Sequence, residues 1–92
     1  MGFDVVVSEK AAKQIKELGR RQGELLIAWL MKNIRGTEDP RSRGKALVGN
    51  MRGLWRYRVG DYRIVCDIQD DKLVVLVLSA GHRGEIYGVR GQ

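Results

Sequence analysis

Three arginines within residues 54–68 have the residue type and spacing to bind a negatively charged ligand. Arg56 and Arg58 precede the pair Gly60-Asp61, and Arg63 follows it. β-branched and aromatic residues alternate with the arginines, and Gly-Asp suits the two-residue loop of a β-hairpin. In such a hairpin Arg58 lies opposite Arg63, and Arg56 lies on the same face. Because guanidinium groups donate paired hydrogen bonds to phosphate oxygens, this face is predicted to bind phosphate.

The other face of the predicted hairpin is apolar and should belong to the core. It comprises Trp55, Tyr57, Val59, Tyr62, Ile64 and Cys66. The predicted pairs are Val59 with Tyr62, Arg58 with Arg63, Tyr57 with Ile64 and Arg56 with Val65. Like charges opposite each other destabilise an antiparallel pair, so an anion held between Arg58 and Arg63 would relieve their repulsion. Two structural alternatives are arginines that extend separately into water and neutralisation of Arg56 by Asp67.

A second group of polar residues follows the nearly unbroken apolar run 73–80, which predicts a central strand covered on both faces. We expect Ile68 to pair with Leu73, and Ile64 therefore to lie beside Val77. With this register, residues 81–87 leave the strand next to Arg58 and Arg63. If those residues turn helical, Arg83 and Tyr87 are four apart and share a face.

These residues together could act on a phosphodiester. Tyrosine can stack on a base, and His82 is the single side chain with an unperturbed pKa near neutrality. The sequence has no convincing P-loop, metal-spaced His and Cys set, carboxylate pair or Ser-His triad, so no cofactor or metal is expected. A metal-independent ribonuclease is still compatible with these residues, because a ribose 2′-OH can attack its neighbouring phosphate while cations stabilise the transition state. The structural alternatives are a solvated His82 and a Tyr87 packed on the sheet edge.

The elements that must position these residues predict an α+β fold. A short strand over residues 3–7 ends at Ser8, a favourable N-cap, and an apolar stripe at helical spacing follows as far as Gly19. A second helical run spans residues 25–34, so the two helices form an αα-hairpin. The predicted order is β-α-α-β-β-β with a short C-terminal helix, and an antiparallel sheet of about four strands packs on the helices. No element is predicted for residues 45–53.

Composition places the chain among small basic cytoplasmic proteins. Its 92 residues suit a single domain, 1–92, with a net charge of +6. Residues 41–92 hold 10 basic and 5 acidic residues, so the excess charge lies in the half that contains the hairpin. This distribution favours a polyanion such as nucleic acid, or an acidic protein, as partner. The lone Cys66 fits a reducing cytosol, and no apolar run is long enough for a membrane span.

The same residues carry a resemblance to a known family. The stretch from Gly53 to Arg63, the strand Val74 to Ser79 and the run Gly81-His82-Arg83-Gly84-Glu85-Ile86-Tyr87 resemble the RelE toxins of the RelE/ParE superfamily. The resemblance implies a small antiparallel sheet backed by two N-terminal helices. It also implies a toxin of a type II toxin-antitoxin pair, which enters the ribosomal A site and cuts the mRNA.

The resemblance implies roles by position. Arg56 and Arg58 match basic residues that contact the mRNA backbone or assist proton removal, and Arg63 matches the arginine that holds the scissile phosphate. Arg83 matches the residue proposed to stabilise or protonate the leaving group, and Tyr87 the tyrosine that stacks on the mRNA. Some RelE proteins have lysines at the positions of Arg56 and Arg58. Because arginine effectively cannot lose its proton, a general-base role does not transfer to Arg56 or Arg58. Either one of them acts purely through its charge, or His82, Tyr87 or the ribosome supplies the base.

Two other functions suit this fold. A ParE-like module would inhibit DNA gyrase without chemistry of its own, and a basic RNA-binding domain would hold RNA without cutting it. For a toxin, the resemblance implies an acidic, partly disordered antitoxin (RelB-like), through which the complex would bind operator DNA. The basic second half and the extra apolar surface of residues 25–31 are candidate docking places for it.

Overall fold

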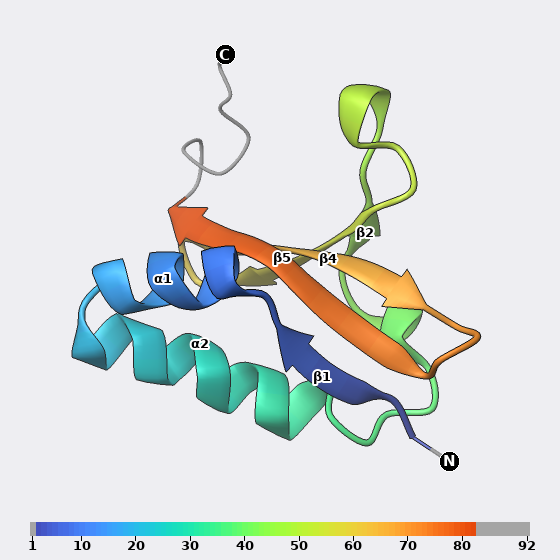
Figure 1. Cartoon of the computed structure of the whole chain (residues 1–92), viewed down its shortest axis with the longest axis horizontal. Coiled ribbons are helices and arrows are strands. Elements are labelled where there is room, and N and C mark those ends of the chain that lie inside the picture. The colour runs from blue at the N-terminus through green and yellow to red at the C-terminus, as the bar shows by residue number, and fades with distance from the viewer. Residues whose placement is uncertain (1, 83–92) are drawn as a thin grey trace.

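The computed structural model describes residues 2–82, which form a five-stranded sheet with two helices packed on one face (Figure 1). In chain order the elements are β1 (Asp4–Val7), α1 (Glu9–Glu17), α2 (Arg20–Asn33), β2 (Lys45–Ala46), β3 (Trp55–Val59), β4 (Tyr62–Gln69) and β5 (Val74–His82), with two short 3-10 helices at Pro40–Ser42 and Gly49–Met51. The strand order across the sheet is β1-β5-β4-β3-β2.

The predicted α+β class and its αα-hairpin are confirmed, and two details of the sheet differ. β1 pairs in parallel with β5, so the sheet is mixed rather than wholly antiparallel. β5, the last strand of the described residues, thus lies between β1 and β4. A fifth strand, β2, pairs with β3 within the region for which no element was predicted. The predicted C-terminal helix lies outside the described residues.

The helices begin and end for local reasons. The Ser8 hydroxyl accepts a hydrogen bond from the Ala11 amide at 3.1 Å and caps α1, as the sequence predicts. Gly19, with φ of 96°, separates α1 from α2. α2 begins five residues before the predicted start, because its first turn is polar and shows no apolar period. Gly23 in that turn is buried, and a Cβ there would lie 3.0 Å from the Ile15 carbonyl oxygen, so glycine allows the two helices to approach closely.

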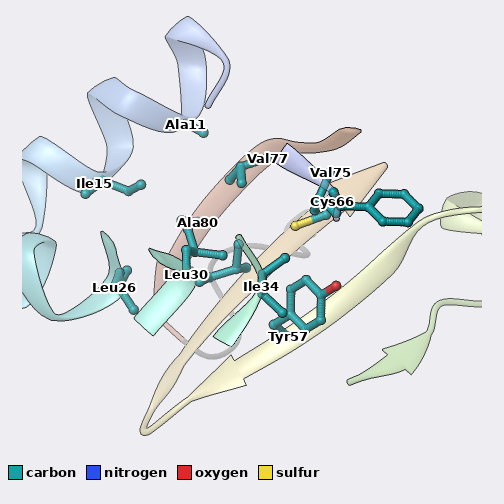
Figure 2. Close-up of a cluster of buried hydrophobic side chains, with 12 residues drawn as sticks. Ala11, Ile15, Leu26, Leu30, Ile34, Tyr57, Cys66, Val75, Val77 and Ala80 are labelled. Carbon is teal, nitrogen blue, oxygen red and sulfur yellow. The ribbon is translucent and has the colours of Figure 1, made fainter. Parts of the chain in front are cut away.

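The core lies between the helices and the sheet. Figure 2 shows side chains of both helices directed toward those of β3, β4 and β5. The labelled members are Ala11, Ile15, Leu26, Leu30, Ile34, Tyr57, Cys66, Val75, Val77 and Ala80, and all are buried. The predicted apolar face of the hairpin therefore is the core face, with Tyr57, Ile64 and Cys66 fully buried. Trp29 of α2 packs on Tyr57 with ring centroids 5.4 Å apart.

The register of the β3–β4 hairpin is confirmed, whereas the predicted register of β4 with β5 is wrong. Arg58 pairs with Arg63 as predicted. Ile64, however, pairs with Ala80 rather than Val77. One cause is the turn, which includes Leu73 in the left-handed region (φ 53°), so Gln69 pairs with Val74 and β5 starts one residue later than expected.

The second cause of the shifted register is a β-bulge. The pairing moves by one residue between Val65 and Cys66, so Leu78 on β5 has no partner on β4. β5 therefore continues to His82, and Gly81 and His82 lie within the strand instead of following it.

Beyond the end of β1, the Gln14 side-chain oxygen of α1 accepts a hydrogen bond from the Ala80 amide at 2.9 Å. None of the helices described is both long and apolar enough to cross a membrane.

Candidate phosphate-binding site

Four cationic side chains share the face of the sheet opposite the helices. Lys45 on β2 pairs with Arg56 on β3, and Arg58 on β3 pairs with Arg63 on β4. Directly opposed residues point to the same face, and Arg56 and Arg58 are two apart on one strand, so all four project to one side. We call this set the arginine face. It contains two like-charged cross-strand pairs, each of which destabilises the sheet unless an anion lies nearby.

Arg63 is the most unusual member of the arginine face. Only 7% of its surface is exposed, yet its Nε and one terminal nitrogen have no hydrogen-bond partner among the described residues. Its strand neighbour Gly81 has no side chain to stand over the guanidinium group. Buried polar groups are nearly always hydrogen-bonded, and buried charges are nearly always paired. An unpartnered buried guanidinium group is therefore suited to an anion that residues 2–82 do not supply.

Arg56 and Arg58 extend the site across β3. Arg56 is half-buried, and its Nε also lacks a partner in the part of the chain that the structure describes. Arg58 is exposed. The alternative in which Asp67 neutralises Arg56 is not observed, since no ion pair joins them within residues 2–82, and Asp67 accepts a hydrogen bond from Gln69 at 3.1 Å.

Lys45 was missed by the sequence analysis. A strand of two residues is too short to give a recognisable alternation, so neither its pairing with Arg56 nor its face could be predicted. The signal available was the basic composition of residues 41–45, which has three cations in five residues.

The remaining predicted site residues are placed differently or lie outside the description. His82 pairs with Tyr62, and the two rings meet edge to face with centroids 5.3 Å apart. Because Tyr62 belongs to the core side of the hairpin, this pairing puts His82 on the face opposite Arg63. Arg83 and Tyr87 lie outside the described residues, and their convergence on the arginine face stays a prediction.

The buried ionisable groups beneath the site are held in their neutral forms. Burial raises the pKa of the Cys66 thiol to about 12. Burial also raises the pKa of Tyr57, whose hydroxyl donates a hydrogen bond to the Pro40 carbonyl oxygen at 2.6 Å. Neither group can accept a proton at neutral pH. Within residues 2–82, no three His, Cys, Asp or Glu side chains lie close enough to hold a metal ion.

The segment that carries Lys45 is fixed tightly to β3. The Trp55 indole nitrogen donates a hydrogen bond to the Arg43 carbonyl oxygen at 2.7 Å. Gly44 has φ of 82°, and a Cβ at that position would overlap the Arg56 carbonyl oxygen. Only glycine permits this approach. The basic residues on either side of Gly44 are thus held beside Arg56 by backbone contacts rather than by charge.

Comparison with known proteins identifies the family. Residues 5–87 match the family model described as the ParE toxin of type II toxin-antitoxin systems, parDE. No curated protein is significantly similar to the chain in sequence. The fold is similar to the Mycobacterium tuberculosis toxin-antitoxin complex RelBE2, with a TM-score of 0.81 and 23% identity over 90% of this chain and 93% of that one.

Two further solved structures support the assignment. A mutant of the Escherichia coli toxin RelE in the free state has a TM-score of 0.70 and 27% identity over 95% of this chain and 92% of that one. The archaeal RelE–RelB complex from Pyrococcus horikoshii has a TM-score of 0.66 and 21% identity over 91% of this chain and 98% of that one. The family model spans nearly the whole chain, and the fold agrees with it. The chain therefore belongs to the RelE/ParE superfamily of toxins from type II toxin-antitoxin systems.

Proposed function

We propose that the protein is a ribosome-dependent endoribonuclease that cuts mRNA in the ribosomal A site and so inhibits translation. The observation that carries the proposal is Arg63, a buried guanidinium group with donors that no described residue satisfies. Arg58 lies directly opposite it, and together they can hold one phosphodiester from two sides. The 27% identity with the E. coli toxin RelE over most of both chains supports the same reading.

The reaction needs no external nucleophile. The ribose 2′-OH attacks the adjacent phosphorus and the bond to the 5′-oxygen of the next nucleotide breaks, which leaves a 2′,3′-cyclic phosphate and a 5′-OH. Negative charge gathers on the phosphoryl oxygens in the transition state, where Arg58 and Arg63 stabilise it. Arg56 contacts the backbone beside them. Such groups cost no reorganisation at the moment of reaction because the sheet already holds them in place.

Proton transfer must come from other residues. Arginine does not deprotonate, Tyr57 and Cys66 are buried and neutral, and His82 lies on the other face of the sheet. We assign Arg83 to the leaving oxygen and Tyr87 to the mRNA, as the family resemblance implies. The base that removes the 2′-OH proton is then Tyr87 or a group of the ribosome.

The toxin is proposed to act in the cytoplasm and to be silenced by an acidic antitoxin. Relatives of this fold are solved as toxin-antitoxin complexes, including the E. coli toxin RelE with an antitoxin peptide. On this chain, Leu25 and Met31 of α2 are large exposed apolar side chains, which an antitoxin helix could cover. Operator DNA would be bound through the antitoxin part of such a complex.

The test is cleavage of mRNA on translating ribosomes. Arg63→Ala, Arg83→Ala and Tyr87→Ala are compared with the wild type and with Lys13→Ala on α1, which lies on the other side of the sheet. Losing one preorganised donor should lower the cleavage rate by about 10²–10³-fold. Circular dichroism and thermal unfolding verify that each variant is folded. Full cleavage by all three site variants, or no cleavage by the wild type, would refute the proposal.

A second function is favoured by the ParE description of the matching family model. In that reading the protein inhibits DNA gyrase and does no chemistry, so Arg63 would bind a partner's acidic group. A supercoiling assay with purified gyrase separates the two. Inhibition of supercoiling by the wild type, with mRNA intact on ribosomes, would establish this second function in place of the first.

A further inference from the structure

A cavity of about 360 Å³ lies beside the arginine face, at the edge of β3. Its walls are formed by Trp29, Arg43, Gly44, Lys45, Arg56 and Arg58. β2 pairs only with Trp55 and Arg56, so the edge of β3 beyond Arg56 has no strand partner among the described residues. The cavity opens there, and Trp29 reaches it from the helical layer.

The charge of this cavity is of one sign. Four of the six lining residues are cationic, and none is acidic. Arg43, Lys45 and Arg58 are exposed, and no ion pair within residues 2–82 involves any of the four. A concave surface that concentrates unpaired positive charge attracts anions, and planar guanidinium groups favour phosphate in particular.

The cavity is separate from the phosphate position at Arg63. Lys45 lies on β2 and Arg63 on β4, with β3 between them. Neighbouring strands are about 4.8 Å apart, so the two positions differ by about 10 Å across the sheet. Arg63 is not among the residues that line the cavity. Arg58 lines the cavity and also lies opposite Arg63, so the two positions form one continuous basic surface.

Trp29 gives the cavity a surface suited to a base. The indole is half-buried, with its ring tilted by 51° against Tyr57, and it also contributes to the cavity wall. Single-stranded nucleic acid is typically bound by a positive groove along the backbone with an aromatic ring against a base. The cavity combines both features.

We propose that this cavity is a second RNA subsite, which holds a phosphate next along the strand from the one at Arg63 and places the adjoining base against Trp29. The inference rests on the proposed function and extends it, since it makes the protein a reader of several consecutive nucleotides. Lys45 and Arg43 would bind the RNA backbone, while Arg63 binds the phosphate of the linkage that is cut.

The experiment compares two noncleavable single-stranded 2′-O-methyl oligoribonucleotides, a dinucleotide with one linkage and a pentanucleotide with four. Binding to the purified full chain is measured by NMR titration at several salt concentrations. The test variant is Arg43→Met with Lys45→Met, whose side chains make no hydrogen bond or ion pair among the described residues. The matched control is Lys10→Met with Lys13→Met, which removes the same charge from α1.

The double variant at the cavity should bind the pentanucleotide about tenfold more weakly and the dinucleotide as the wild type does. The slope of log affinity against log salt should become shallower by about 0.7 for each phosphate that the variant no longer binds. The control should change neither. In addition, the pentanucleotide should quench part of the tryptophan emission, and Trp29→Phe, which keeps a ring on Tyr57, should remove that quench.

Failure of the subsite is distinguishable from failure of the proposed function. If the cavity variant binds both oligonucleotides like the wild type while Arg63→Met weakens both, the subsite is wrong and the primary phosphate position stands. Equal weakening of both lengths, or an equal effect of the α1 control, would also overturn a separate subsite. If Arg63→Met changes neither affinity, the phosphate position of the proposed function fails.

Discussion

The two faces of the central sheet differ in whether their buried polar groups have hydrogen-bond partners. On the helix side, Tyr57, Ile64 and Cys66 are fully buried among apolar neighbours, and the hydroxyl of Tyr57 is hydrogen-bonded. On the other side, Arg63 is nearly as buried, yet two of its nitrogens have no partner among the described residues. The first face stabilises the fold. The second holds charges in place at a cost to stability, as expected for a site that awaits an anionic ligand.

The largest effect is expected on the helix side. Leu30→Ala removes a fully buried side chain between α2 and the sheet, and should lower the free energy of unfolding by about 2–5 kcal/mol. The matched control, Leu25→Ala on the same helix, alters a side chain that is 53% exposed and should change stability far less. Urea denaturation measures both. Equal losses would contradict the assignment of the core to this face.

Substitution of Arg63 is expected to raise the stability of the protein instead of lowering it. Arg63→Met replaces an unpartnered buried charge by an apolar side chain of similar length, and should raise the free energy of unfolding by about 1–3 kcal/mol without ligand. Thermal unfolding of the free protein checks this. The exposed Arg52→Met is the control and should be neutral. A destabilised Arg63→Met would mean that the guanidinium group is satisfied within the protein, and the contrast between the faces would fail.

A smaller gain is expected from reversing one charge of the like-charged pair. Arg58→Glu places a carboxylate opposite Arg63 and turns cross-strand repulsion into attraction, worth about 0.2–1 kcal/mol. The variant should be slightly more stable than the wild type and should lose phosphate binding. Chemical denaturation at low and high salt measures the gain, which added salt should reduce. Arg58→Gln, a neutral control, should lie between the two.

The smallest effect concerns an exposed ion pair that belongs to neither face. Arg41 donates two hydrogen bonds of 2.9 Å to Asp70, and this lowers the pKa of the Asp70 carboxyl. A carboxyl with a depressed folded pKa stabilises above its unfolded pKa and loses that contribution as pH falls through the folded value. Asp70→Asn should therefore reduce stability slightly at neutral pH, and the difference should vanish in strong acid, where the carboxyl is protonated in both states. Urea denaturation across this pH range measures it. A difference that persists in acid would exclude the charge as its cause.

Local chemistry explains which parts of this architecture could be predicted. The two-residue loop Gly60-Asp61 admits one register, so the pairs across β3 and β4 followed directly from the sequence. The β4–β5 register depended on a longer turn with Leu73 at positive φ and on a bulge at Val65, and neither has a clear signal in residue type. His82 was predicted to follow the strand and instead lies within β5, for the same reason.

The candidate site was predictable in membership and less so in its energetics. Alternation alone placed Arg56, Arg58 and Arg63 on one face. The burial of Arg63 could not be predicted, because it depends on how distant segments meet around the strand. Lys45 joins the face through a strand too short to recognise, and Trp29 reaches the neighbouring cavity around an open strand edge. Both depend on tertiary geometry.

The position of β5 has a consequence for synthesis of the protein. It is the last strand that the structure describes, yet it lies between β1 and β4 (Figure 1). Until β5 has left the ribosome, β1 lacks the strand with which it pairs, and Gly81 is not beside Arg63. A nascent chain thus emerges without a finished anion site.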